Sequence, residues 1–157
     1  MEKARSAFAH ARAGDVPALQ EILELGISPN IKNEKGDTPL MLAAYHGHVD
    51  AARLLLENGA DPDVRNDKGQ SPLDGVAFKG DLVMVELLLD KGAIVDSAGP
   101  DGKTALMFAA MFDRVEVLEL LVARGASAAL ADLSGANAQA LAEAQGSVRA
   151  VARLRSL

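Results

Sequence analysis

Apolar residues recur along the chain in short clusters that are separated by polar, glycine-containing segments. The most hydrophobic cluster, Leu54–Leu56, returns as Leu87–Leu89 and again as Leu120–Val122, which places successive clusters 33 residues apart. A narrower apolar stripe precedes each cluster, as at Leu40 and Ala44, whose spacing of four residues is that of one face of a helix. The pattern therefore predicts a repeating unit of two helices, a thin one rich in small residues and a more hydrophobic one.

Polar residues and glycines mark where the helices of each unit begin and end. Thr38 precedes one apolar stripe, and a hydroxyl at that position caps free backbone amides at a helix start. Gly47 is predicted to end this first helix, and the second helix is expected over about residues 49–58, before Gly59. Two glycine series share the period of 33 residues: Gly36, Gly69, Gly102 and Gly135, and Gly26, Gly59, Gly92 and Gly125.

The start of the first helix carries a recognisable motif. Thr38–Leu40 reads Thr-Pro-Leu, and it becomes Ser-Pro-Leu at Ser71–Leu73 and Thr-Ala-Leu at Thr104–Leu106. The repeat resembles the ankyrin repeat, a turn plus two antiparallel helices with the signature T-P-L-H-x-A, and the resemblance covers essentially the whole chain. Three residues replace the signature histidine, so its usual hydrogen bond to the capping hydroxyl is expected to be absent or altered: Met41, Asp74 and Met107.

The resemblance implies an all-α fold, an ankyrin-repeat solenoid of stacked helix-turn-helix units joined by β-turn or hairpin-like loops. We expect about three full interior repeats between two degenerate capping repeats, all in one domain over residues 1–157. The expected repeats are 1–32 as the N-terminal cap, 33–65, 66–98, 99–131, and 132–157 as the C-terminal cap.

Some positions depart from the repeat. Asp113 replaces the helix-ending glycine of the fourth repeat, and Asp tolerates a left-handed backbone better than most residues. The segment 97–102, which enters that repeat, predicts a looser turn than the others. In the end repeats, charged residues such as Arg5 and Arg149 are expected to keep the outer face soluble.

Composition and charge narrow the chemistry. The chain has no cysteine, which excludes disulfides, cysteine metal sites and thiol nucleophiles. Its net charge is −6 with acidic and basic residues interspersed, so the basic stripe that nucleic acid requires is missing. The first residues predict an amphipathic helix instead of the apolar core of a signal peptide, and no apolar run reaches membrane-spanning length. We therefore expect a cytoplasmic protein that binds neither nucleic acid nor membranes.

Exposed positions near the end of each first helix are the candidate binding residues, because ankyrin proteins usually bind through these positions and the turn tips on a concave surface. Three of the five aromatic residues of the chain lie there, and Tyr, Phe, Met and Arg are enriched at interface centres. The predicted helix-end positions are Arg12, Tyr45, His46, Phe78, Lys79, Met111 and Phe112. The predicted charged rim consists of the turn-tip residues Glu34, Lys35, Asp37, Arg65, Asp67, Lys68, Gln70, Asp101 and Lys103.

An alternative explanation of the aromatic residues is that they pack against neighbouring repeats and stabilise the stack. The remaining aromatics, Phe8 and Phe108, fall at positions expected to face the core. Catalytic and metal-binding interpretations are disfavoured. His46 and His48 lack a third ligand of suitable geometry, and no serine lies in a nucleophile-elbow context.

The sequence therefore predicts a protein-protein interaction module, an adaptor, inhibitor or scaffold, that is not an enzyme and needs no cofactor or metal. Its partner is expected to be another protein, and the chain itself is expected to be monomeric. The alternative function is structural, with the same residues mediating homo-oligomerisation. A rigid stacked array favours the first function because it loses little conformational entropy on binding.

Overall fold

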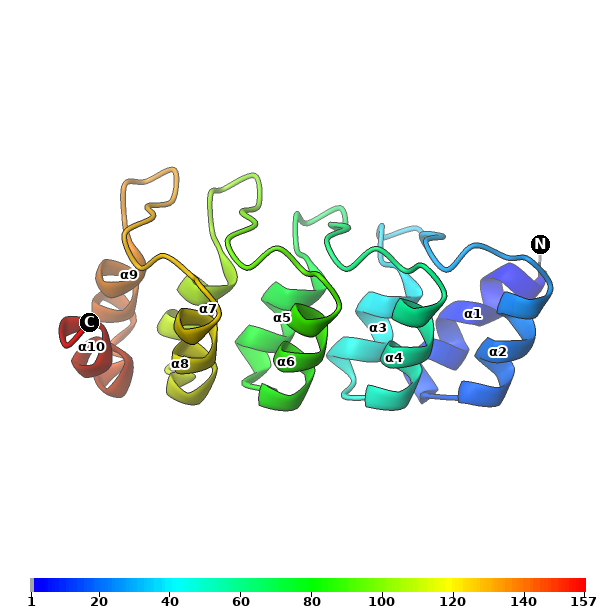
Figure 1. Cartoon of the computed structure of the whole chain (residues 1–157). Helices are drawn as coiled ribbons and strands as arrows, with labels where there is room; N and C mark the ends of the chain where they lie inside the picture. Colours follow the sequence, from blue (N-terminus) through cyan, green and yellow to red (C-terminus); the bar gives the residue numbers. More distant parts are fainter. Residues whose placement is uncertain (1) are drawn as a thin grey trace. The chain divides into compact units, whose positions relative to one another are not determined.

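The computed structural model describes residues 2–157, and this part of the chain folds into ten α-helices (Figure 1). The only β-type pairing within these residues is a single bridge between Ala131 and Asn137. The helices are α1 (Glu2–Ala13), α2 (Val16–Glu24), α3 (Pro39–Tyr45), α4 (Val49–Glu57), α5 (Pro72–Lys79), α6 (Leu82–Asp90), α7 (Ala105–Met111), α8 (Val115–Ala123), α9 (Ala138–Gln145) and α10 (Val148–Arg155). The predicted all-α class and the helix-turn-helix repeat are confirmed.

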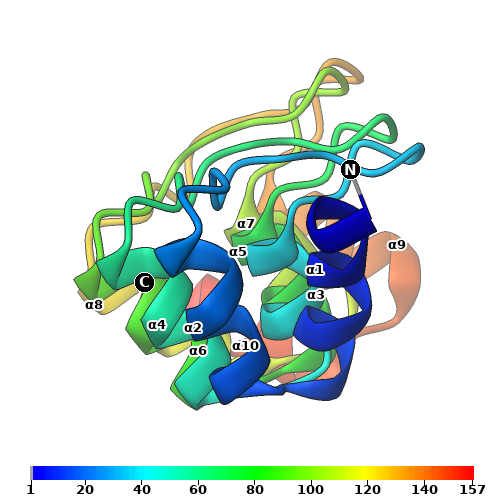
Figure 2. The same cartoon turned by 90° about the vertical axis from the view of Figure 1, so that its right-hand side faces the viewer.

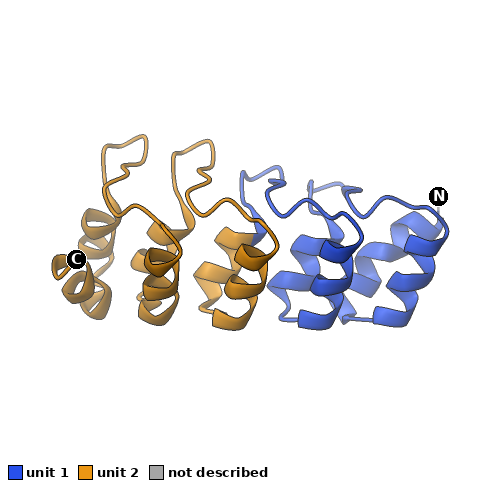
Figure 3. Ribbon diagram, viewed as in Figure 1, with its two compact units in different colours: residues 1–72 blue, residues 73–157 orange. Residues whose placement is uncertain are grey.

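The helices fall into two compact units, which comprise residues 1–72 and 73–157 (Figure 3). The expectation of one domain over the whole chain stays a prediction. None of the helices between residues 2 and 157 combines the length and the apolar composition needed to cross a membrane.

In the first unit, two helix pairs stack side by side. The first helices α1 and α3 pack on each other, and so do the second helices α2 and α4 (Figure 2). Their core is built from small and branched aliphatic side chains that are almost fully buried, including Ala11, Leu19, Leu40, Ala44 and Leu55. Alanine on the facing sides of α1 and α3 lets two helices approach closely, so a thin stripe is sufficient to form a core.

In the second unit, α7 packs on α9 and α6 packs on α8, while α10 contacts α7, α8 and α9. The core again consists of buried aliphatic residues, among them Met84, Leu88, Leu106, Leu118 and Leu121. The hydrophobic clusters on the second helices therefore lie where the 33-residue pattern predicts them.

Side-chain caps fix the helix starts. The Thr38 hydroxyl accepts a hydrogen bond from the Met41 amide at 3.2 Å, and the Thr104 hydroxyl accepts one from the Met107 amide at 3.4 Å. These caps satisfy amides that would otherwise lie unpaired in the interior, since both threonines are 1% exposed. The cap on the helix amide therefore forms although methionine replaces the signature histidine.

The end of each first helix is fixed by a residue with a left-handed backbone. Gly47 has φ 78°, and Asp113, the expected substitute, has φ 59°. The Asp113 carboxylate also accepts a hydrogen bond from the Ala150 amide at 2.8 Å, which joins the end of α7 to α10. Asp113 thus combines the turn of a glycine with a contact that a glycine could not make.

The loops between the repeats are short hairpin-like fingers with a common hydrogen-bond pattern. The Asn33 side-chain oxygen accepts from the Lys35 and Asp37 amides at 2.9 and 3.0 Å, and Asn66 and Asp132 accept from the equivalent amides of their own loops. Gly99 occupies this position in the segment predicted to be loose. That loop keeps the backbone hydrogen bond from the Gly99 amide to the Lys103 carbonyl, and the Asp101 carboxylate accepts from the Lys103 amide at 3.0 Å in place of a side chain at position 99.

Shortening a core leucine tests the packing of the first unit. Leu55 is 1% exposed on α4, so Leu55→Ala leaves a cavity and is expected to lower the free energy of unfolding by about 2–5 kcal/mol. The control is Arg53→Ala, because Arg53 is exposed on the same helix and its loss is expected to change stability by less than about 0.5 kcal/mol. Urea unfolding followed by circular dichroism measures both, and equal losses would contradict this assignment of the core.

Candidate protein-binding surface

The helix-end residues of the first unit lie at the ends of α1 and α3. Tyr45 is the last residue of α3 and is 40% exposed, and His46 follows it as the exposed C-terminal cap residue. Their rings meet edge to face with centroids 5.6 Å apart. Arg12, near the end of α1, is also exposed. The three predicted residues of this unit are therefore all accessible to a partner.

His48 has a structural role instead. Its Nε2 atom lies 2.7 Å from the Arg12 carbonyl oxygen, which is one of the free carbonyls at the end of α1. The ring also lies so close to Gly14 that a Cβ atom there would be 2.5 Å from Nδ1 of His48. Over residues 2–157 no group of three or more His, Asp or Glu side chains is arranged to hold a metal ion.

Some turn-tip residues of the first unit are exposed, and others form hydrogen bonds with other loop residues. The half-buried Asp37 carboxylate accepts a hydrogen bond from the Asn66 side-chain amide at 2.9 Å, and the half-buried Arg65 donates to the Gly69 carbonyl at 2.6 Å. Both side chains hold the loops in place. The exposed rim residues of this unit are Glu34, Lys35, Asp67, Lys68 and Gln70.

In the second unit, the predicted aromatic residues contact each other. Phe78 on α5 is half-buried and Phe112 after α7 is 41% exposed, and their rings meet edge to face with centroids 4.6 Å apart. Arg114 donates from Nε to the Phe78 carbonyl at 2.9 Å and so closes the end of α5. This geometry gives Phe78 a packing role within the unit, while much of Phe112 stays accessible. Met111 is half-buried beside Phe112, and Lys79 is exposed.

An ion pair fixes the position of Lys103, one of the predicted rim residues of the second unit. Lys103 lies 2.9 Å from the buried Asp132 carboxylate, whereas Asp101 is exposed. Hydrogen bonds from the Ser134 hydroxyl and from Lys103 hold the pKa of the Asp132 carboxyl well below its usual range. Lys103 therefore stabilises two neighbouring loops through Asp132.

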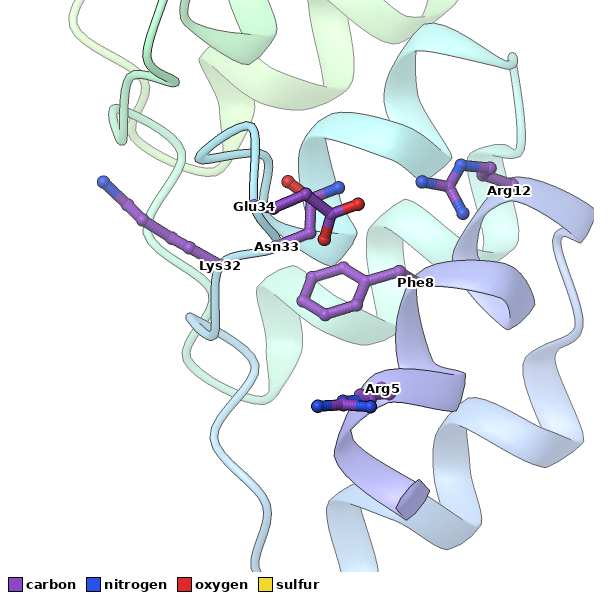
Figure 4. A pocket seen from close by; sticks show the side chains of 6 residues that line it. All are labelled: Arg5, Phe8, Arg12, Lys32, Asn33 and Glu34. Atoms are coloured by element: carbon purple, nitrogen blue, oxygen red, sulfur yellow. The ribbon is translucent and has the colours of Figure 1, made fainter. Parts of the chain in front are cut away.

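The structure also shows a cavity that the sequence did not predict. It has a volume of about 390 Å³, lies in the first unit, and is lined by Arg5, Phe8, Arg12, Lys32, Asn33 and Glu34 (Figure 4). Arg12 and Glu34 are predicted binding residues, but the other four are not. The sequence contained a signal for part of this cavity: residues 5, 8 and 12 are spaced three and four apart and therefore share one face of a helix.

Paired helices at a period of 33 residues, joined by hairpin-like fingers, define a helical repeat protein. The model of the family described as ankyrin repeats (3 copies) matches residues 7–98, 58–132 and 75–155. A segment of 41 residues, 26% of the chain, is 51% identical to PA3287 of Pseudomonas aeruginosa, which is named as an ankyrin repeat protein. That match spans 24% of the relative, about a quarter of its length. The chain belongs to the ankyrin-repeat family.

Family membership indicates what repeats of this kind do in general. Ankyrin repeats are in general non-enzymatic modules for protein-protein interaction. Binding a partner requires exposed side chains. The predicted helix-end residues that are exposed are Arg12, Tyr45, His46, Lys79 and Phe112. Which of them contact a partner stays a prediction.

The Phe78–Phe112 contact predicts energetic coupling between the two rings. In a double-mutant cycle, Phe78→Ala and Phe112→Ala are expected to couple by about 0.5–1.5 kcal/mol, as for other edge-to-face pairs. Urea unfolding of both single variants and of the double variant measures the coupling. Phe78→Ala combined with Val148→Ala is the control, since Val148 is 76% exposed on α10 and is expected to be additive. Additive losses for the phenylalanine pair would contradict a packing role.

The ion pair of Asp132 predicts a specific pH dependence. Asp132→Asn keeps an oxygen for the loop amides, as Asn33 and Asn66 do, but removes the charge that faces Lys103. Because folding lowers the pKa of Asp132, the ionised carboxylate stabilises the fold above about pH 4, and this contribution is lost as the pH falls through the folded pKa. The variant is therefore expected to lose stability less steeply than the wild type between about pH 5 and pH 2. Thermal unfolding midpoints measure both slopes, and identical slopes would contradict the assignment.

Proposed function

We propose that this chain is a scaffold that binds a partner protein through two surface patches, one in each unit. The first patch comprises Arg12, Tyr45, His46 and the exposed turn tips of the first unit. The second comprises Lys79, Met111 and Phe112, with Phe78 packed behind Phe112. Asp101 adds a charge at a turn tip of the second unit.

The observation that carries this proposal is the exposure of large aromatic side chains at the ends of two first helices, Tyr45 at the end of α3 and Phe112 directly after α7. Tyr45 and Phe112 are 40% and 41% exposed, although most large apolar side chains of the repeats are buried. Aromatic residues contribute disproportionately to binding energy when a partner covers them. The exposed turn tips of the first unit carry charges of both signs, which would fix the orientation of the partner.

The backbone around both patches is well supported, which favours binding without large rearrangement. His48 holds the end of α1, and Arg114 holds the end of α5. Ser147 donates from its hydroxyl to the Met111 carbonyl at 2.7 Å and holds the end of α7. Because these helix ends are fixed before binding, a partner would lose less affinity to the ordering of the surface.

Affinity capture from native cell extract tests the proposal. The wild type is expected to retain a protein that the variant Tyr45→Ala/Phe112→Ala loses, because that variant removes the most exposed aromatic area of both patches. The matched control is Val83→Ala/Val148→Ala, since these valines are 61% and 76% exposed on second helices outside the patches. Circular dichroism checks that all variants remain folded.

Two outcomes would count against partner binding through these patches. Proteins retained equally by the wild type and by Tyr45→Ala/Phe112→Ala would show that the patches do not bind them. A concentration-dependent mass in sedimentation that disappears in the same variant would instead assign the patches to self-association.

A further inference from the structure

We infer that the cavity of the first unit binds an acidic segment of the partner, one that carries two carboxylates with an apolar side chain between them. The inference rests on the proposed function and names the chemistry of the partner at one site. Phe8 lines the cavity and is 9% exposed, and Arg5 and Arg12 extend from the same face of α1. Figure 4 shows their guanidinium groups on opposite sides of the Phe8 ring.

The length of α1 brings Arg5 to this cavity. The first helices α3, α7 and α9 begin one residue after a residue whose side chain caps them, as α3 does after Thr38. Arg5 is equivalent to Thr38 by the 33-residue offset, yet α1 begins at Glu2 and continues through this position. The first helix therefore presents a cation where the interior repeats use a buried capping hydroxyl.

Within residues 2–157, the two arginines of the cavity differ from most other arginines in having no hydrogen-bond or ion-pair partner. Neither guanidinium makes a hydrogen bond or ion pair with any residue between 2 and 157, and Arg53 alone shares this property among the arginines. The remaining arginines donate to carboxylates or backbone carbonyls: Arg65, Arg114, Arg124, Arg149, Arg153 and Arg155.

Charge complementarity selects the occupant. The chain carries a net charge of −6, whereas the six residues that line the cavity include three cations and one anion, Glu34. Lys32 already donates to the Arg65 carbonyl at 3.3 Å and extends away from the ring in Figure 4. The available cations are thus Arg5 and Arg12, and guanidinium groups pair with carboxylates through two parallel hydrogen bonds.

The spacing of the two arginines sets the spacing of the carboxylates. Seven residues of helix separate their Cα atoms by about 10 Å. Side chains of an extended chain alternate between its two sides, so positions i, i+2 and i+4 share one side, and the outer two lie about 13 Å apart. Acidic residues four positions apart, with an apolar residue midway, therefore all face the cavity, and the long arginine side chains cover the remaining difference in spacing. An apolar side chain between them would lie over Phe8 and cover the exposed part of its ring. Glu34, at the Arg12 side of the opening, would repel an acidic residue placed too close to it.

Titration of the ¹⁵N-labelled chain with short capped peptides, followed by NMR, tests this inference. The probe is Gly-Glu-Ala-Leu-Ala-Glu-Gly, and the matched control is Gly-Gln-Ala-Leu-Ala-Gln-Gly. The probe is expected to shift the amides of residues 5–12 and 32–34 with a dissociation constant on the order of 1 mM, because solvent-exposed ion pairs are individually weak. The glutamine peptide is expected to bind at least about fivefold more weakly than the probe. Added salt is expected to lower the affinity of the probe but not that of the glutamine peptide.

Charge reversal in the protein gives the second arm of the test. Arg5→Glu/Arg12→Glu is expected to lose at least about fivefold in affinity for the probe. Arg53→Glu is the matched control, because Arg53 is an exposed, unpaired arginine on α4 outside the cavity, and it is expected to bind like the wild type. The inference would be overturned by equal binding of both peptides, by unchanged affinity of Arg5→Glu/Arg12→Glu, or by no saturable shift.

Failure of this inference is distinguishable from failure of the proposed function. Neither Tyr45 nor Phe112 lines the cavity, so Tyr45→Ala/Phe112→Ala is expected to bind the probe like the wild type, and the two experiments test different side chains. A captured partner together with a peptide that does not bind would leave the proposed function standing and overturn the acidic site. Peptide binding without any captured partner would support the site and count against the proposed function.

Discussion

Close packing of small side chains at the facing sides of the first helices is the constraint on which the fold depends. Ala11, Ala44, Ala77 and Ala110 follow each other at the repeat period, and each is 0% exposed. No larger side chain fits at such a position without moving a helix, because protein interiors are packed without space to spare. The large aliphatic residues are therefore concentrated on the second helices, and the aromatic residues lie mainly at the edges of the core.

The same packing leaves helix ends whose polar groups need partners, and neighbouring repeats supply them. His48 contacts the end of α1, Arg114 the end of α5 and Ser147 the end of α7, each at the same place in its repeat. Three different side chains thus perform one structural role, which is to satisfy a terminal carbonyl. These contacts also fix the positions of the residues just before each turn, where the exposed aromatic side chains project.

The sequence was sufficient to predict the helices, the caps and the left-handed turns, because each depends on local chemistry repeated at a fixed period. The expected range of 49–58 for a second helix differs by one residue from α4, which ends at Glu57. Side-chain pairing between repeats was harder to predict. The edge-to-face contact of Phe78 and Phe112 depends on rotamers, and one sequence does not fix which of two adjacent positions turns inward.

The cavity was missed because repeat alignment assigns roles by equivalent position. Alignment places Arg5 under a buried capping threonine, whereas the extra helical turn of α1 changes what that position does. The departure is informative, since it puts a long cationic side chain on the face of α1 that lines the cavity. If this face only had to be soluble, any charged residues there would be sufficient. Two arginines on either side of a buried phenylalanine, in a net acidic chain whose other arginines are mostly paired, form a more specific arrangement. That specificity favours recognition over simple solvation as the role of this face.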